Sequence, residues 1–543
     1  MKLFSHYLLL ACWFALVVFP CSSAFAANPV RHFDIWEYRV EGNSLLQPAQ
    51  VQSALYPFLG PAKSLDDIEQ ARAALQALYK HKGYPIVVVA IPEQNVIGGV
   101  VRLQVVEGTV GRFKISGNQY FSRRVLREEM PSIEEGKPLN MQSVRAELDA
   151  ANKLNAYRSL TPVIRPGRKP GTMELELKVQ DQLPLYGSVE VNNRYTATTS
   201  KTRLMLSVGY DNLWQAHHSV SLNYQMAPQE PGEVDVLNLT YVLPLGESSR
   251  LAMFAVDSKS ETATVTDQGD DLLVLGNGQV LGLRGIFSSR VSDDYFSTLV
   301  TGFDYKDFGE QSEISNPDDT SRQNVPIDYT TFTVTYNGTL KHNLDLTRFS
   351  IGAVFAFRSL GNDDMVTEFQ DEFDYKRALA EGNFFITRAS ISRNWSVSEN
   401  VQLYASLKGQ YTENPLISNE QFSAGGVDTV RGYLESSALG DNAVLGNLEA
   451  HYNLLPLADW KKLNELDLSC FVDFARLRTL EALPNADGEV ISYTDLLGAG
   501  IGLTASAYKS LDLALFWAAP LKDLDSDDFD DDSKLHFRVN YRF

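Results

Sequence analysis

The C-terminal part of the chain, from Leu183 to Phe543, is dominated by a two-residue alternation of apolar and polar side chains. Its last segment, residues 535–543, alternates without a break, with apolar residues at odd positions and polar or charged residues at even positions. In an extended strand, successive side chains point to opposite faces of a sheet. Such a segment forms a strand with one apolar face. That face points inward in a soluble sandwich and toward lipid in a membrane barrel.

The same two-residue alternation predicts sixteen strands in this region. They are expected at 184–196, 201–212, 217–227, 234–243, 249–258, 276–290, 293–307, 327–340, 345–358, 381–396, 399–412, 440–455, 464–475, 494–508, 511–520 and 533–543.

The connections between these strands separate by length. After even-numbered strands most are short: 244–248, 291–292, 341–344, 397–398 and 509–510. After odd-numbered strands, from the fifth on, they are long and polar: 259–275, 308–326, 359–380, 413–439, 476–493 and 521–532. Short turns at one end and long loops at the other are typical of outer-membrane barrels, whereas a soluble sandwich has no reason to separate them. The pattern favours a barrel.

Residues 1–26 have the pattern of an export signal. Lys2 supplies a positive start, Tyr7–Phe19 an apolar core, and Ala24–Ala26 an A-x-A cleavage site. The core is too short for a membrane anchor, which needs roughly 20 residues. A lipoprotein signal would use Cys21, but Pro20 directly before it is unfavourable. We expect an exported mature chain.

Composition excludes several classes of function. The formal charge of −20 argues against a nucleic-acid partner, because such proteins neutralise phosphates. The three cysteines are Cys12, Cys21 and Cys470, so cleavage of the leader leaves one thiol. We therefore expect no intrachain disulfide and no cysteine metal site.

An internal repeat precedes the strand-rich region. Residues 38–43 (YRVEGN) match residues 113–118 (FKISGN) at an offset of 75 residues. Each copy continues with a short helical pattern, a longer helix and two strands, expected at 48–56, 64–81, 85–92 and 100–107 and then at 122–130, 141–157, 161–165 and 173–180. This β-α-α-β-β order resembles the POTRA module of outer-membrane assembly and secretion proteins. We predict POTRA 1 at 33–108, POTRA 2 at 109–181 and the barrel at 183–543.

The longest predicted loop carries a motif with functional meaning. Val430-Arg431-Gly432-Tyr433, after the eleventh strand, resembles the loop-six signature of the superfamily that joins POTRA modules to a sixteen-stranded barrel. The segment 471–475 (FVDFA) resembles that family's F-x-D-x-G motif on strand thirteen, with Ala475 in place of the usual glycine.

The resemblance implies that loop six folds into the barrel, where Arg431 pairs with Asp473. A guanidinium matches a carboxylate in bidentate geometry. The alternative is a surface arginine in a flexible loop. Alternation also places Phe471 on the same face as Asp473, so an aromatic ring would face the lumen.

At this length, two such modules and sixteen strands resemble a two-partner secretion transporter (TpsB) of the hemolysin-activator and filamentous-hemagglutinin transporter type. The implied fold is α+β periplasmic POTRA modules followed by a 16-stranded antiparallel transmembrane β-barrel in the outer membrane of a Gram-negative bacterium. The implied function is to bind an unfolded client, a large TpsA-type exoprotein, and move it to the cell surface. An outer-membrane assembly factor, or insertase, of the same superfamily remains the alternative.

Further expectations follow from the resemblance. Tyr541 and Phe543 resemble a C-terminal assembly signal read by the barrel assembly machinery. Family transporters usually begin with a plug helix. Only residues 27–32 lie between the expected cleavage site and the first strand, so we expect no plug and a pore closed by loop six alone.

An outer-membrane enzyme and a passive porin are the remaining alternatives. No histidine lies in a recognised nucleophile context such as G-x-S-x-G, so we expect no catalytic activity, cofactor or metal. The acidic run 523–532 lacks the spacing and glycine of a calcium loop. We expect a solvated loop there, bridged by divalent ions to lipopolysaccharide.

Overall fold

The computed structural model describes residues 32–246, 248–260, 263–267, 270–274, 277–316, 319–357, 365–367, 370–457, 462–484, 488–524 and 532–543. The expected signal peptide and the expected absence of a plug helix lie outside the described residues, as does most of the acidic run 523–532.

The first N-terminal module is a mixed three-stranded sheet with two helices. Strands β2 (Glu37–Glu41), β5 (Val100–Val106) and β4 (Val88–Ala90) lie in the order β2-β5-β4. The helices are α1 (Pro48–Leu55) and α2 (Leu65–His81), and a two-stranded piece pairs β1 (Phe33–Ile35) with β3 (Gly60–Lys63). Helix α2 forms where predicted because Ser64 caps it, accepting a hydrogen bond from the Asp67 amide, and because Ile68, Ala71, Leu75 and Tyr79 share its buried face.

The second module repeats this plan. Strands β6 (Thr109–Ser116), β8 (Thr172–Asp181) and β7 (Arg158–Pro166) lie in the order β6-β8-β7, with helices α3 (Arg123–Glu128) and α4 (Met141–Leu154). The predicted element order is therefore observed in both copies. The longer helix stops at Leu154, before the predicted end at 157, because the chain must turn to begin β7 at Arg158.

The repeated Gly-Asn has the same structural role in both modules. Gly42 and Gly117 have φ values of 83° and 88°, and a Cβ on either would lie 2.3 Å from the carbonyl oxygen of Val105 or Val179. Glycine is required for both reasons. The following asparagine then bonds to the backbone three residues on: Asn43 donates to the Leu46 carbonyl, and Asn118 to the Phe121 carbonyl.

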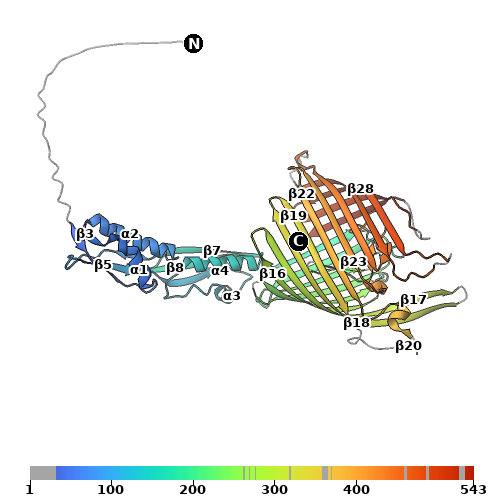
Figure 1. The fold of residues 1–543 in the computed structure, drawn as a ribbon. Helices are drawn as coiled ribbons and strands as arrows, with labels where there is room; N and C mark the ends of the chain where they lie inside the picture. The colour runs from blue at the N-terminus through green and yellow to red at the C-terminus, as the bar shows by residue number, and fades with distance from the viewer. Residues whose placement is uncertain are drawn as a thin grey trace, which may run out of the picture. The chain divides into compact units, whose positions relative to one another are not determined.

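Residues 183–543 form a closed antiparallel barrel of sixteen strands, whose tilted wall is seen in Figure 1. All sixteen predicted strands are present. They are β9 (Leu185–Asn192), β10 (Arg203–Leu213), β11 (His218–Met226), β12 (Asp235–Pro244), β13 (Ser249–Lys259), β16 (Gly278–Arg290), β17 (Tyr295–Asn316), β18 (Asp319–His342), β19 (Asp345–Ala356), β22 (Phe385–Ser396), β23 (Val401–Tyr411), β26 (Asn442–Asn453), β27 (Leu463–Arg478), β28 (Tyr493–Ala507), β29 (Leu511–Pro520) and β30 (Lys534–Arg542).

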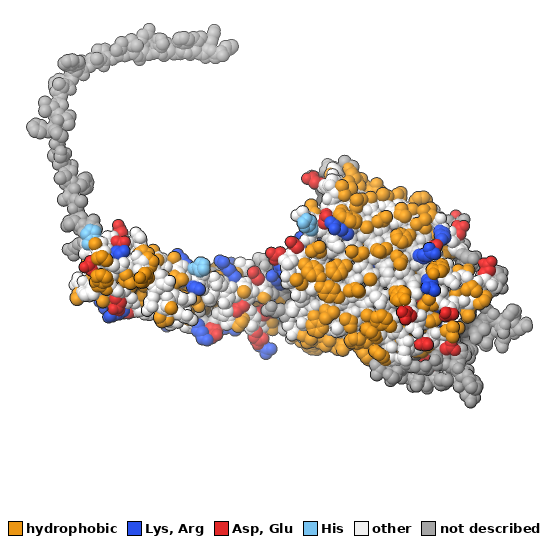
Figure 2. Space-filling model, viewed as in Figure 1, with side chains coloured by type: hydrophobic (Ala, Val, Ile, Leu, Met, Phe, Trp, Pro, Cys, Tyr) orange, Lys and Arg blue, Asp and Glu red, His pale blue; other side chains and the backbone are white. Residues whose placement is uncertain are grey.

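The alternation of each strand places apolar side chains on the outside. On the last strand, Leu535, Val539 and Tyr541 are exposed, whereas His536 between them is buried in the barrel. Hydrophobic side chains accordingly cover much of the outer wall in the view of Figure 2. This is the surface of a barrel that faces lipid. Among the described residues, no helix has both the length and the hydropathy needed to cross a bilayer.

Two predicted loops contain strands instead. Residues 308–326 were expected to be a loop, but β17 runs on to Asn316 and pairs along its whole length with β18. The loop after the fifth strand contains the hairpin β14 (Ala263–Asp267) and β15 (Asp270–Val274). Polar, turn-rich composition predicted loops here. However, hydrogen bonding between adjacent antiparallel strands can continue past the membrane whatever the side chains are.

Candidate functional site: a latched loop in the barrel

Loop six, defined as residues 412–441 between β23 and β26, folds back into the barrel. It contains a short 3₁₀ helix, η3 (Ser418–Glu420), and a two-stranded hairpin of β24 (Phe422–Ala424) and β25 (Ala438–Gly440). The motif Val430–Tyr433 lies at the tip between these strands. The hairpin thus carries a four-residue motif to the inner wall.

Arg431 and Asp473 are in direct contact. Asp473 lies on β27, and its Oδ2 accepts hydrogen bonds from Arg431 Nε at 2.6 Å and from the Arg431 amide at 3.1 Å. Its Oδ1 accepts from Nη2 at 2.7 Å. The Arg431 side chain is 5% exposed and the Asp473 side chain is fully buried. This bidentate, buried geometry is the strongest form of the pair.

Phe471 faces the lumen, as alternation along β27 requires. Its ring lies beneath Arg431, with the guanidinium carbon 3.5 Å from the ring centroid. Phe516 of β29 packs edge-on against Phe471. A cation over an aromatic face is attracted by the ring quadrupole, most strongly when water is excluded. The aromatic ring is therefore part of the arginine site.

Two residues of β26 complete the polar contacts. Glu449 accepts a second Arg431 Nη2 hydrogen bond at 2.6 Å. Asn447 donates both to Asp473 Oδ1 at 2.9 Å and to the Thr429 carbonyl at 2.8 Å. Burial by itself lowers the pKa of Arg431, but the carboxylates of Asp473 and Glu449 outweigh this and raise it above its ordinary value. An arginine side chain is not deprotonated in proteins, so Arg431 is a cation at this site.

The other motif residues fix the tip to neighbouring strands. Val430 is buried in an apolar cluster that includes Ala475, the residue at the motif's glycine position. The Gly432 amide points at His536 Nε2 at 3.4 Å. The Tyr433 hydroxyl donates to the Lys522 carbonyl at 2.6 Å and accepts from the Leu497 amide at 3.2 Å. The tip is thereby held by strands from β26 to β30.

Gly498 was not singled out from the sequence, although it makes room for this tip. A Cβ on Gly498 of β28 would lie 1.9 Å from the Arg431 carbonyl oxygen. The only available signal was the glycine alternation at positions 498, 500 and 502.

We expect Gly498→Val to displace the tip of loop six, because the added side chain would overlap the Arg431 backbone. Protease cleavage within loop six should increase several-fold in intact outer membranes. Gly409→Ala is the control, since its Cβ would meet only the Ala443 carbonyl oxygen, at 3.4 Å. Equal cleavage of the two variants would contradict the close approach.

A second anchor holds the beginning of loop six on a different part of the wall. Glu420 of η3 accepts from Lys306 of β17 at 2.5 Å and from the Tyr329 hydroxyl of β18 at 2.7 Å. The Lys306 and Glu420 side chains are 10% and 2% exposed. Burial alone raises the pKa of Glu420, but Lys306 and Arg388 hold it below its usual value. No motif in the sequence indicated this pair.

Loop five, defined as residues 357–384 between β19 and β22, also contacts loop six. Its short helix α5 (Glu372–Lys376) is followed by Arg377, whose guanidinium binds Asp441 at 2.5 and 2.7 Å. Asp441 is fully buried at the end of loop six and also accepts from the amides of Leu416 and Leu480. The two loops are therefore tied together at one carboxylate.

An apolar cluster lies between these loops and the wall. Its wall residues come from β12, β13, β16, β17, β18, β19 and β22 and include Phe254, Phe308 and Tyr329. Loop five adds Phe373, Ala380 and Phe384 to it, and loop six adds Leu416 and Ile417. We expected loop six alone to close the pore, but loop five also packs inside the barrel beside loop six. The polar composition of loops five and six gave no indication that their few apolar side chains are buried in one cluster.

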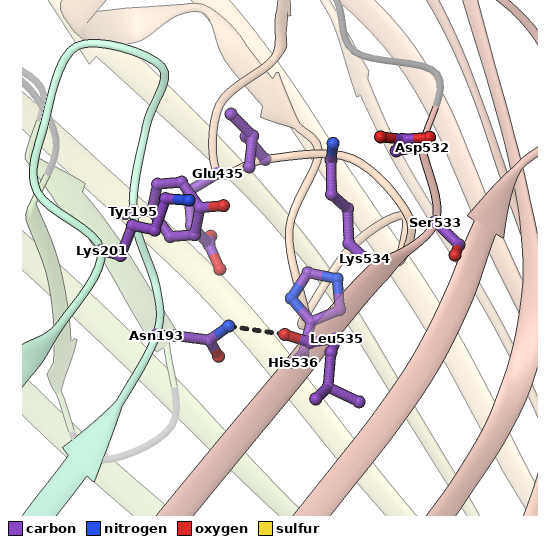
Figure 3. Close-up of a pocket in the computed structure, with 10 residues that line it drawn as sticks. Asn193, Tyr195, Lys201, Glu435, Asp532, Ser533, Lys534, Leu535 and His536 are labelled. Atoms are coloured by element: carbon purple, nitrogen blue, oxygen red, sulfur yellow. Dashed lines mark hydrogen bonds between the residues drawn. The ribbon is translucent and has the colours of Figure 1, made fainter.

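The end of loop six reaches the junction of the first and last strands. Strands β9 and β30 share five registered pairs, the fewest of any adjacent pair in the barrel. Beyond them, Asn193 donates to the Leu535 carbonyl at 2.6 Å, as Figure 3 shows. A pocket of about 250 Å³ opens there, lined by Asn193, Tyr195, Lys201, Leu434, Glu435 and residues 532–536. The Glu435 amide donates to the Tyr195 carbonyl at 3.1 Å, so loop six continues the pairing of the first strand.

The predicted terminal residues lie at the opposite end of this junction. Tyr541 and Phe543 are exposed on the outer face, and the Phe543 backbone exchanges hydrogen bonds with Gly187. In the part of the chain that the structure describes, no three histidine, cysteine or acidic side chains are placed to hold a metal ion.

Comparisons with known proteins agree with this architecture. The family model "POTRA domain, ShlB-type" matches residues 33–108, and the model "Haemolysin secretion/activation protein ShlB/FhaC/HecB" matches residues 171–505. The outer membrane transporter CdiB of Dickeya dadantii is 23% identical over 77% of this chain and 72% of its own length. The hemolysin transporter protein ShlB of Serratia marcescens is 25% identical over 76% of this chain and 72% of its own length.

Solved structures share the fold. CdiB from Escherichia coli superposes with a TM-score of 0.56 at 20% identity, covering 97% of this chain and 93% of that one. BamA from Haemophilus ducreyi, lacking POTRA domains 1–3, has the same TM-score at 14% identity, covering 94% of this chain and 100% of that one. The second family model spans more than half of the sequence. The chain therefore belongs to the ShlB/FhaC/HecB haemolysin secretion/activation family of outer-membrane two-partner secretion transporters, with its barrel in the outer membrane and its POTRA domain in the periplasm.

Proposed function

We propose that this chain is a dedicated transporter that captures one unfolded exoprotein in the periplasm and passes it through the barrel to the cell surface. The proposal is carried by the family match across the barrel, together with lumen loops that buried ion pairs and an apolar cluster attach to the barrel wall. The proposed role of the chain includes no catalysis. Its partners are a large TpsA-type client, outer-membrane lipid and lipopolysaccharide, and the barrel assembly machinery, with no nucleic acid.

Each proposed part of the chain has its own task. Residues 1–26 direct export, the modules at 33–108 and 109–181 are POTRA 1 and POTRA 2, and residues 183–543 form the conduit. Sheet edges such as β2 and β4 offer unpaired backbone groups to an extended client. Such pairing uses little sequence information, which suits an unfolded chain.

The latch at the tip of loop six is the moving part in this proposal. Val430, Arg431, Gly432 and Tyr433 hold the tip on Asp473 and its neighbours until a client displaces them. Periplasmic transport has no ATP, so we propose that folding of the client outside the cell supplies direction by mass action. Tyr541 and Phe543 mark the barrel for assembly.

An insertase remains the second candidate, because BamA has a similar barrel fold. The family matches favour secretion over this alternative.

Deleting this gene in its host and comparing proteomes separates the two functions. We expect one large exoprotein to disappear from the culture supernatant while other barrel proteins stay at their normal level. Expression of the gene from a plasmid should restore the exoprotein. A general fall of several barrel proteins, with no single missing exoprotein, would contradict the transporter assignment and support the insertase.

A further inference from the structure

The outer wall of the barrel has a hollow of about 710 Å³. It lies over β22, β23, β26 and β27, with Tyr493 of β28 at its rim. Small outward residues form its floor, notably Ala389 and Gly409, while Ile391, Leu407 and Val444 flank it. The side chains around the hollow are mainly apolar and several are exposed, so its surface suits hydrocarbon.

Two arginines stand at one end of this hollow. Arg476 and Arg478 occupy outward positions on β27, in register with the exposed Val472 and Phe474. Arginine on the lipid face costs about 2–4 kcal/mol at the bilayer midplane and little near the interface. Strand β27 begins at the short-turn end of the barrel and ends at Arg478, so both arginines lie at the extracellular interface. Exposed Tyr411 and Tyr493 mark the same level as an aromatic girdle.

The charge at this end of the hollow is positive. Asp495 is 3.6 Å from Arg476, too far for a hydrogen bond, and it binds Lys522 at 2.5 Å instead. Among the described residues, no carboxylate is paired with Arg478. Among the ion pairs described at this end, two cations, Arg476 and Lys522, share one carboxylate, Asp495.

The two guanidiniums are also held in place. Arg476 lies over the Tyr493 ring at 4.9 Å and Arg478 at 5.8 Å. Stacking orients a guanidinium while leaving its N–H groups free to donate, which is the arrangement that suits phosphate. The Arg476 side chain is 64% exposed, so its donors are accessible from outside.

We infer that this hollow binds the lipid anchor of lipopolysaccharide, with an acyl chain on the apolar floor and a glycan phosphate on Arg476 and Arg478. The inference rests on the outer-membrane location of the barrel and not on the identity of any secreted client. The ligand class is an acylated, phosphorylated disaccharide, which carries both the hydrocarbon and the anionic charge that the two halves of the site require. An ordinary phospholipid of the inner leaflet would meet the opposite end of the barrel.

The test is lipid retention by the purified full-length protein. The protein is placed in nanodiscs of phosphatidylethanolamine and phosphatidylglycerol with a small fraction of bis-phosphorylated lipid A, and bound lipid A is counted by native mass spectrometry. We expect the double variant Arg476→Gln and Arg478→Gln to reduce retention of lipid A about tenfold, because two exposed charge-assisted contacts are lost. The matched control is Arg290→Gln, another exposed arginine that stacks on an aromatic ring, Phe296 at 5.3 Å, but at the short-turn end of β16.

A second variant tests the hollow without altering charge. A Cβ on Gly409 meets only one atom, at 3.4 Å, so Gly409→Leu can be accommodated and fills the floor. Retention should fall again. Three results would each overturn the inference: retention by the double arginine variant equal to that of the parent, no effect of Gly409→Leu, or equal competition by phosphatidylglycerol or inorganic phosphate. No client and no export assay enter this test, so the proposed function could fail while the lipid site stands.

Discussion

Replacing Arg431 with alanine is expected to lower exoprotein export at least tenfold while the barrel still inserts into the outer membrane. The substitution leaves Asp473 buried without its cation and removes the ring contact with Phe471. Leaving one member of a buried ion pair without its partner costs on the order of 3–5 kcal/mol, which is enough to release the loop tip. The barrel wall itself keeps its backbone pairing, so we expect assembly to continue.

Export is measured as exoprotein in the supernatant, and insertion as heat-modifiable mobility in outer-membrane fractions. Arg284→Ala is a close control. Arg284 also pairs with a buried lumen carboxylate, Asp304 at 2.5 Å, and lies over a phenylalanine ring, Phe254 at 5.0 Å. Its ionic partner Asp304 lies on the wall strand β17, whereas the ion pair of Arg431 joins a loop to the wall. If Arg431→Ala exported as well as Arg284→Ala, the latch would have no role in transport.

The second large effect is expected at the other anchor. Glu420→Gln should raise the ion conductance of the purified barrel in planar bilayers several-fold. The change leaves Lys306 as an uncompensated cation beside an apolar cluster, which favours entry of water and withdrawal of Leu416 and Ile417 from the wall. Because conductance needs no client, this result is independent of the secretion assay.

Lys306→Met provides a complementary variant. It replaces the cation with a side chain of similar length, which leaves Glu420 without its cation in the same apolar surroundings. It should also increase conductance, while Arg284→Met, which removes a cation from the adjacent strand, should not. Conductance at the parent level in both anchor variants would show that this pair does not keep the loop in place.

The two anchors explain how a pore could be both closed and releasable. Buried ion pairs add little net stability compared with apolar packing, but they specify one arrangement of the groups that carry them. Here each pair joins a loop to the wall, and the apolar cluster excludes water from one of them. A client that displaces the apolar side chains would admit water, and hydration would then weaken the pair. Release is therefore expected to be cooperative.

Much of the fold could be predicted from the sequence. The alternation on strands such as β30 survives in the structure because a lipid-facing strand must place apolar groups on one side only. The repeat was visible because the glycines at positions 42 and 117 are constrained by local geometry in each module. These signals are local in sequence, and each reports one physical requirement.

The contacts of the candidate site could not be predicted from local patterns in the sequence. The pairing of Arg431 with Asp473 was suggested only through resemblance to a family, since a sequence contains many arginines and aspartates of equal chemistry. Glu420 and Lys306 carried no such motif and are 114 residues apart. Alternation predicted that Phe471 faces the lumen but gave no reason for an aromatic ring there. The structure supplies the reason, because the Arg431 guanidinium lies over this ring.

The sequence by itself therefore determined the strand number, the direction of each strand face and the positions of most short turns. These follow from alternation and turn composition, which act over a few residues. Only the tertiary structure decided that loops five and six occupy the lumen together, that Gly498 makes room for the tip, and that Arg476 and Arg478 share one ring. Closing the barrel brings distant strands to a common interior and a common outer face, and side-chain packing there depends on geometry that no short segment contains.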